Sequence, residues 1–128
     1  MYFRYRNLKP IGHGAYGVVV SAYDEYRNSK VAIKKIKNIF QNSVLTKRIV
    51  REVKLMKQFN GQEHILPLLD LITRKNNDKT VDIYLVLTLM ESDLDQIIRS
   101  PQSLSTAHIK FFLYQLLRAL HYIHSAVS

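Results

Sequence analysis

Three glycines and one lysine near the start of the chain have the types and spacing suited to phosphate chemistry. Gly12, Gly14 and Gly17 form the pattern G-x-G-x-x-G, and Lys34 closes the segment that follows them. Because glycine has no Cβ, a backbone rich in it can bring its N–H groups close to an anion. The lysine ammonium supplies a matching positive charge. This segment therefore predicts a loop that covers the phosphates of a nucleotide.

The residues after the last glycine discriminate among three kinds of glycine-rich loop. A P-loop requires Lys and then Ser or Thr directly after that glycine, where this chain has Val18 and Val19. A Rossmann fingerprint requires a helix to begin there, but Val18 to Val20 is a β-branched run that favours a strand. We therefore predict a β-hairpin with the glycines at its tip. A polar break at Asp24 to Lys30 then leads into a third strand, Val31 to Ile36.

This segment resembles the protein kinases. Their loop pattern G-x-G-x-x-G-x-V matches Gly12 to Val19, and their strand motif V-A-I-K matches Val31 to Lys34. Side chains alternate along a strand, so Ala32 and Lys34 share one face and Lys35 lies on the other. The resemblance implies that Ala32 lines an adenine slot and that Lys34 points at the phosphates. A slip of one residue in the strand register would exchange Lys34 and Lys35.

Thr46 to Phe59 is predicted to be a helix, and Glu52 is its only acidic residue. As an exposed side chain, Glu52 would pair with Arg48 at i−4 and contribute little to stability. In kinases, a helix glutamate holds the strand lysine against the α- and β-phosphates. The resemblance therefore implies that Glu52 pairs with Lys34. The apolar residues recur at helical spacing, at Ile49, Val53 and Met56.

Two further apolar segments, Ile65 to Ile72 and Val81 to Thr88, have the composition of strands. With an edge strand at Tyr5 to Ile11, they predict a five-stranded antiparallel sheet with one inserted helix, which is an α+β fold. The resemblance implies that residues 1–90 form a kinase N-lobe. Residues 91–128 would then form the hinge and the first two helices of an incomplete C-lobe.

The residues after the last strand resemble the hinge of the mitogen-activated protein kinases. Met90 to Leu94 fits their Met-Glu-x-Asp-Leu pattern. The resemblance implies that the backbone of Leu89 and Met90 hydrogen-bonds adenine. It also implies that Asp93 meets the ribose and that Leu87 is the gatekeeper. Asp93 is equally suited to cap a short helix, and the two roles are compatible.

The resemblance covers nearly the whole chain. Ile11 to Val19 and Phe112 to Ala126 also fit the mitogen-activated branch, and Met90 to Ile98 is most similar to its extracellular-signal-regulated members. The second half of the chain is predicted to contain helices at Leu94 to Arg99 and at about Ser105 to Ser125.

The resemblance also implies which residues of this chain contribute to the nucleotide site. Lys34 and Glu52 would be the catalytic residues present here, and Arg51 would contact the phosphothreonine of an activation loop. The other nucleotide-binding residues would be Ile11, Gly12, His13, Gly14, Ala15, Tyr16, Gly17, Val18, Val19, Ala32, Leu89, Met90 and Asp93.

ATP is the cofactor that the resemblance implies, and Mg²⁺ is expected with it. Kinases hold Mg²⁺ and orient the accepting hydroxyl with His-Arg-Asp, a downstream Asn, and Asp-Phe-Gly. Neither triplet occurs in these 128 residues. The chain by itself is therefore expected not to catalyse phosphoryl transfer.

The composition limits the remaining functions. The net charge is +9, and all of the excess lies in residues 1–60, whose net charge is +10. This excess could attract ATP, bind nucleic acid or simply be solvated, and we predict no nucleic-acid partner. The chain has no cysteine, so disulfides and cysteine-based zinc sites are excluded, and His121 and His124 at i, i+3 lack a third metal ligand. No apolar run approaches the ~18 residues of a membrane span, so we expect a cytoplasmic or nuclear protein without a membrane partner.

Two hypotheses for the function follow. In the first, the chain is the ATP-binding part of a serine/threonine mitogen-activated protein kinase, with protein substrates and an upstream mitogen-activated protein kinase kinase as partners. In the second, it is a truncated, non-catalytic product that binds nucleotide or a partner protein. The broad apolar stripe of the last helix motivates the second hypothesis, because without a second lobe to cover it that stripe would seek a partner.

Overall fold

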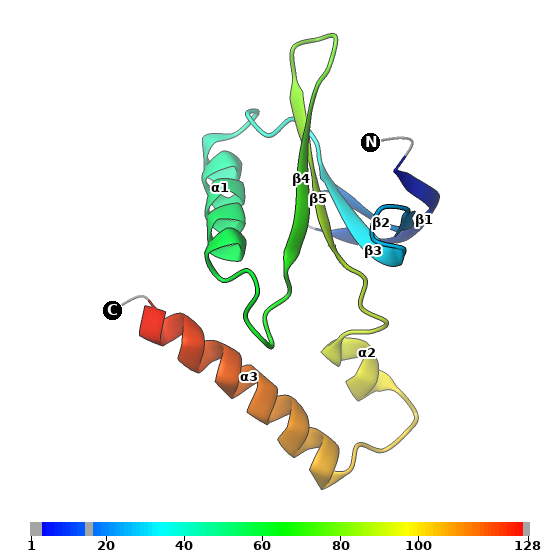
Figure 1. Ribbon diagram of the computed structural model, residues 1–128, viewed down its shortest axis with the longest axis vertical. Helices are drawn as coiled ribbons and strands as arrows, with labels where there is room; N and C mark the ends of the chain where they lie inside the picture. Colours follow the sequence, from blue (N-terminus) through cyan, green and yellow to red (C-terminus); the bar gives the residue numbers. More distant parts are fainter. Residues whose placement is uncertain (1–3, 15–16, 127–128) are drawn as a thin grey trace. The chain divides into compact units, whose positions relative to one another are not determined.

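The computed structural model describes residues 4–14 and 17–126 of the chain. Its five strands form one antiparallel sheet in the order β1-β2-β3-β5-β4 (Figure 1). The predicted α+β fold is confirmed. The elements are β1 (Tyr5–Gly14), β2 (Gly17–Asp24), β3 (Ser29–Ile36), α1 (Ser43–Gln58), β4 (Leu68–Lys75), β5 (Val81–Thr88), α2 (Leu94–Arg99) and α3 (Thr106–Ala126).

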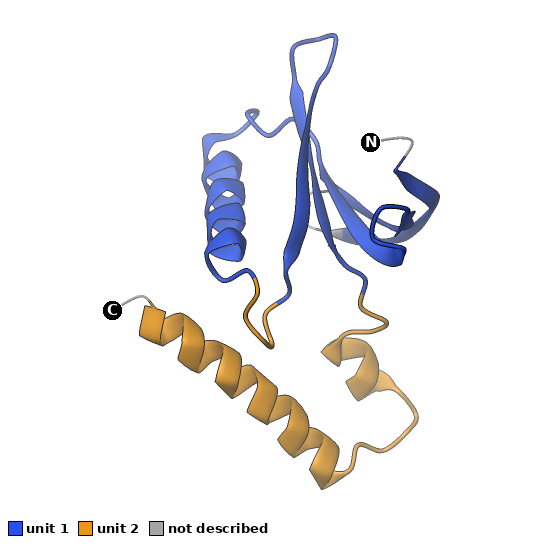
Figure 2. Ribbon diagram, in the orientation of Figure 1, with its two compact units in different colours: residues 1–60, 66–89 blue, residues 61–65, 90–128 orange. Residues whose placement is uncertain are grey.

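The chain divides into two compact units (Figure 2). The first unit comprises residues 1–60 and 66–89 and contains the sheet and α1. The second comprises residues 61–65 and 90–128 and contains α2 and α3. Each unit is described by itself below.

The sheet of the first unit carries one apolar cluster on each face, as strand alternation requires. On the face that α1 covers, the buried residues are Ile36, Ile49, Leu68, Ile83 and Leu85. On the opposite face they are Tyr5, Ala22, Val31, Ile33, Tyr84 and Val86. Along β3 and along β5, successive side chains therefore point to opposite faces of the sheet, and the cluster to which a residue belongs shows which face its side chain occupies.

Helix α1 begins at Ser43, earlier than the predicted start at Thr46. The cause is a cap. Asn42 has an extended backbone, and its side-chain oxygen accepts hydrogen bonds from the N–H groups of Val44 at 2.8 Å and Leu45 at 3.4 Å. These donors have no partner within the helix, so an Asn in this position stabilises an additional turn.

Strand β4 begins at Leu68, whereas the apolar pattern predicted a start at Ile65. The preceding residues form a turn instead, in which His64 has a positive φ of 69° and Ile65 donates to the carbonyl of Gln62 at 3.3 Å. Pro67 then stands directly before the strand and has no N–H to donate to a sheet. The backbone in this stretch is therefore unavailable for strand pairing.

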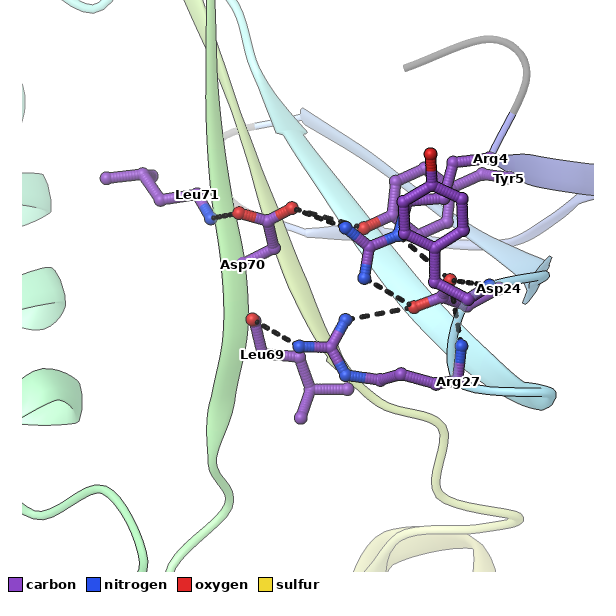
Figure 3. A network of polar contacts seen from close by, with 8 residues as sticks. Arg4, Tyr5, Asp24, Arg27, Leu69, Asp70 and Leu71 are labelled. Carbon is purple, nitrogen blue, oxygen red and sulfur yellow. Dashed lines mark hydrogen bonds and ion pairs between the residues drawn. The ribbon is translucent and has the colours of Figure 1, made fainter.

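The buried carboxylate of Asp24, at the end of β2, connects Arg4, which directly precedes β1, to Arg27 in the turn between β2 and β3 (Figure 3). The Asp24 side chain has 0% exposure and accepts hydrogen bonds from Arg4 Nε at 2.9 Å, Arg27 Nη1 at 3.0 Å and the N–H of Tyr26 at 3.0 Å. Arg4 also lies 3.6 Å from the Asp70 carboxylate on β4. These donors, Arg4 first, hold the pKa of Asp24 far below its usual value although burial opposes them. The base of the glycine hairpin is thus fixed to the rest of the sheet.

The second unit is helical, and its two helices are confirmed close to their predicted bounds. Asp93 caps α2, since its carboxylate accepts from the N–H of Gln96 at 2.8 Å. Ser105 caps α3, since its hydroxyl oxygen accepts a hydrogen bond from the N–H of His108 at 3.1 Å. Helix α3 has no buried residue, and at least half of the surface of several large side chains is exposed: Ile109, Phe111, Leu113, Tyr114, Leu116 and Leu117.

Candidate functional site

Lys34 and Glu52 approach each other on the α1 face of the sheet. Lys34 follows Ala32 and precedes Ile36 on the same side of β3, and its Nζ lies 3.6 Å from the Oε1 of Glu52 on α1. The two side chains are 20% and 37% exposed. Among the described residues, the ion pair found for Glu52 is therefore with Lys34 and not with Arg48, the exposed alternative.

Lys35 points to the other face of the sheet. Its Nζ lies 5.6 Å from the centroid of the Tyr84 ring, and Tyr84 belongs to the apolar cluster of that opposite face. The register slip considered above is therefore excluded. Of the two neighbouring lysines, Lys34 is the one that shares a face with Glu52.

The glycines of the hairpin occupy very different surroundings. Gly12 pairs with Val19 and Gly14 with Gly17 across β1 and β2. A Cβ added at Gly17 would overlap the carbonyl oxygen of Lys35, whereas one at Gly12 would meet nothing within 4 Å. Packing against β3 therefore requires glycine at position 17, while Gly12 leaves open space beside the strand. Ala15 and Tyr16, also predicted to contact nucleotide, lie outside the described residues.

The remaining predicted residues of the hairpin and β3 divide between the faces. Ala32 is 9% exposed and pairs with Leu87 on the Lys34 side of the sheet. Val19 pairs with Lys34 and shares its face. Val18 lines a pocket on the opposite face, so its side chain points away from Lys34. On β1, Ile11 and His13 are both exposed.

The predicted hinge residues belong to two different units. Leu89 is half-buried in the first unit, directly after β5. Met90 and Asp93 belong to the second unit, where Met90 is 63% exposed and Asp93 caps α2. Arg51, the predicted phosphothreonine contact, is exposed on α1.

No metal site is found in the part of the chain that the structure describes. It contains no group of three or more His, Cys, Asp or Glu side chains that could hold a metal ion, and this includes the surroundings of His121 and His124. None of the helices over the same residues combines the length and the apolar character needed to cross a bilayer.

Sequence reasoning missed a pocket of about 350 Å³ on the sheet face opposite Lys34. Its lining includes Val18, Val20, Ile33, Lys35 and Tyr84. The residues come from separate strands, and only the register of the sheet brings them together. Strand alternation indicated that Ile33 and Lys35 share a face, but no pattern along the chain indicated a hollow there.

Comparison with known proteins agrees with this geometry. The protein kinase domain family matches residues 5–127, so the chain belongs to that family. Mitogen-activated protein kinase 7 of Arabidopsis thaliana is 50% identical over 123 residues, which are 96% of this chain and 33% of that protein. Extracellular signal-regulated kinase 1 of Dictyostelium discoideum is 48% identical over 123 residues, or 96% of this chain and 23% of its own length.

A further relative is Mitogen-activated protein kinase 3 of Oryza sativa subsp. japonica, which is 48% identical over 96% of this chain and 33% of its own length. The predicted resemblance to mitogen-activated protein kinases is thereby confirmed. The chain spans about a third or less of the length of these curated relatives.

Proposed function

We propose that the first unit binds ATP on the α1 side of its sheet, beneath the glycine hairpin. The observation that carries this proposal is the ion pair between Lys34 and Glu52, with Nζ and Oε1 3.6 Å apart in a half-buried setting. A partly buried ammonium group that is held by a carboxylate keeps its positive charge and can also attract phosphate. Lys34 would contact the phosphates, and Glu52 would hold Lys34 in place.

The surroundings of Lys34 suit a nucleotide. Ala32 is small and nearly buried on the same face, so a flat ring can approach the strand closely. Gly12 has free space where a Cβ would be, which leaves room for the backbone to approach a phosphate. The side chain of Val19 faces the same side as Lys34 and would cover the ring from the hairpin.

The activity of the whole protein would be transfer of the γ-phosphate of ATP to Ser or Thr of protein substrates, under an upstream mitogen-activated protein kinase kinase. The names of the relatives support this assignment. Phosphoryl transfer also needs Mg²⁺ and a residue that orients the accepting hydroxyl. The described residues hold no cluster that fits a metal, so we assign no Mg²⁺ ligand to them.

Nucleotide binding is tested with two neighbouring substitutions. The chain is titrated with a fluorescent ATP analogue as the wild type, as Lys34→Met and as Lys35→Met. Both variants lose one positive charge and keep a long apolar stem, but only Lys34 lies beside Glu52. We expect Lys34→Met to weaken binding about tenfold or more and Lys35→Met to change it less than twofold. Equal weakening by both variants would show that net charge, not the site, attracts the nucleotide.

Catalysis is tested on a longer chain that also contains a catalytic loop and an activation segment. Phosphorylation of a Ser/Thr-Pro peptide should disappear in the Lys34→Met variant and persist in Lys35→Met. Activity that survives Lys34→Met would refute the role assigned to Lys34.

A second candidate function is partner binding by a non-catalytic form of the chain. The exposed apolar side chains of α3 favour it, because such stripes are usually covered by another surface. Sedimentation of the chain decides this candidate. A well-dispersed monomer that does not bind a hydrophobic dye would count against it.

A further inference from the structure

Asp82, at the start of β5, is one of two acidic residues that are buried in the described part of the chain, the other being Asp24. It is 7% exposed, and its Oδ1 accepts a hydrogen bond from the backbone N–H of Asn38 at 2.8 Å. The N–H of Asn38, followed by the Asn76 side chain, holds the pKa of Asp82 below its usual value although burial opposes them. A buried charge is costly without such partners, so the contact fixes Asp82 and Asn38 to each other.

The contact with Asp82 fixes a turn between β3 and α1. Asn38 has a positive φ of 45°, in the left-handed region that most residues avoid and asparagine tolerates. The next N–H, that of Ile39, donates to the carbonyl of Val81 at 2.9 Å. Two successive N–H groups after β3 therefore donate to two successive residues of β5. Residues 37–42, which we call the β3–α1 linker, are held to the sheet at this point.

The β3–α1 linker also holds the first turn of α1. The carbonyl of Ile39 accepts a hydrogen bond from the Thr46 hydroxyl, and the Ile39 side chain packs against the apolar cluster that contains Ile49. Among the residues of α1, all of which the structure describes, only Ile49 is buried, and the other apolar side chains at the sheet are partly buried. The position of α1 on the sheet therefore depends on how its first turn is held.

The ion pair between Glu52 and Lys34 follows the position of α1. Its two atoms are 3.6 Å apart, which is longer than a good hydrogen bond, and both side chains are partly exposed. A pair of this kind contributes little to stability, so it does not fix the helix by itself. Glu52 lies six residues after Thr46, or about 9 Å along the helix axis, so a displacement of the first turn moves Glu52 as well.

We infer that Asp82 is a positioning residue for the proposed ATP site. Asp82 fixes the β3–α1 linker, the linker fixes the first turn of α1, and α1 brings Glu52 to Lys34. The consequence for nucleotide binding rests on the proposed function. Without the Asp82 acceptor, the backbone of Asn38 loses the contact that holds its positive φ, and the start of α1 is released from β5.

Amide hydrogen exchange of the chain without nucleotide tests whether Asp82 positions α1. Asp82→Ala removes the acceptor, whereas Asp82→Asn keeps an uncharged acceptor oxygen on a side chain of the same shape. Asp78→Ala is the matched control. Asp78 also accepts a backbone N–H, that of Thr80 at 3.0 Å, but it is exposed in the turn between β4 and β5.

We expect Asp82→Ala to accelerate exchange of the α1 amides about tenfold more than exchange of the β2 amides. Asp82→Asn should give about a threefold difference and Asp78→Ala less than a twofold one. If Asp82 only stabilised the fold as a whole, the amides of α1 and β2 would accelerate by the same factor, which would overturn the inference. The same criterion applies to Asp82→Asn should Asp82→Ala fail to fold.

Nucleotide binding tests whether the effect of Asp82 passes through Glu52. The fluorescent ATP analogue is titrated into chains that carry Asp82→Ala, Glu52→Gln or both substitutions. We expect Asp82→Ala to weaken binding about fivefold in the wild-type background and less than twofold beside Glu52→Gln, and Asp82→Asn should restore most of the affinity. Equal weakening in both backgrounds would overturn the inference. If the wild type does not bind the analogue, the ATP proposal alone fails, and hydrogen exchange still decides whether Asp82 positions α1.

Discussion

Substitution of Asp24 by Asn tests whether its buried carboxylate holds the hairpin strands to the sheet. Asn keeps the shape of the side chain but removes its charge and turns an NH₂ group toward one guanidinium. Asp24 accepts from two guanidinium groups and from backbone N–H groups at 2.9–3.4 Å, and its side chain has 0% exposure. Removing one member of a buried ion pair costs about 3–5 kcal/mol.

The structure places the expected effect at the lower end of that range. The side chains of Arg4 and Arg27 are 24% and 37% exposed, so each can turn partly to water after the substitution. We therefore expect Asp24→Asn to lower the free energy of unfolding by about 3 kcal/mol. With a urea m-value of about 2 kcal/mol/M, the unfolding midpoint would fall by about 1.5 M.

Glu25→Gln is the matched control for this measurement. Glu25 is the next residue along the chain and forms an ion pair of similar length, 2.8 Å, with Arg6, but the two side chains are 37% and 64% exposed. An exposed pair contributes about 0.5 kcal/mol. Urea denaturation followed by circular dichroism at pH 7 compares the two variants. Losses of equal size would refute the argument that burial decides the strength of the Asp24 contacts.

The dependence on pH provides a second check on Asp24. Its pKa in the folded protein lies far below the value of about 3.9 that an unfolded chain has. The stability that it contributes is therefore complete above about pH 5 and is lost as the pH falls below 4 toward the folded pKa. Between pH 5 and pH 3, the unfolding midpoint of the wild type should fall more steeply than that of Asp24→Asn. Parallel slopes would contradict the assignment of this acid sensitivity to Asp24.

Two further predictions concern the hairpin and α1. Gly17→Ala should clearly lower the urea midpoint of unfolding, because the added Cβ would overlap the Lys35 carbonyl. Gly12→Ala should leave this midpoint unchanged but weaken binding of the fluorescent ATP analogue. The reverse pattern would contradict the roles given to these two glycines. Asn42→Ala should destabilise the first unit by about 1 kcal/mol through loss of the α1 cap, with Asn77→Ala in the β4–β5 turn as a control of the same chemistry. An unchanged midpoint in Asn42→Ala would mean that the cap does not stabilise the helix.

The kinase resemblance implied the pairing of Lys34 with Glu52, and local periodicity accounts only for the faces on which these residues were expected. The period-2 alternation of β3 separated Lys34 from Lys35, and the 3.6-residue period of α1 placed Glu52 next to its apolar stripe. Each of these two inferences needed only neighbouring residues, whereas the ion pair that joins the two elements followed from the resemblance. The start of α1 was misplaced although Asn42 is a typical capping residue, because the polar stretch around it reads equally well as a loop.

Features that depend on register between strands were not predictable. Asp24 and Arg4 are twenty residues apart, and their contact requires Tyr5 to pair with Asp24 across β1 and β2. The position of Leu8 depends on a register shift around Asn7, whose positive φ no periodicity reveals. A shift of one residue exchanges the faces of a strand, so neither the buried network nor the outer pocket follows from composition or spacing.

The glycine pattern shows how one motif can have two physical causes. G-x-G-x-x-G was interpreted as a single device for approaching phosphate, but the surroundings of its first and last glycines differ. Gly17 is fixed by the backbone of β3 at Lys35, so the absence of a Cβ there is already required in the folded chain without any ligand. Gly12 has no such neighbour. Packing within the described fold therefore does not require glycine at position 12. A nucleotide phosphate in the space beside Gly12 would give a reason for the missing side chain.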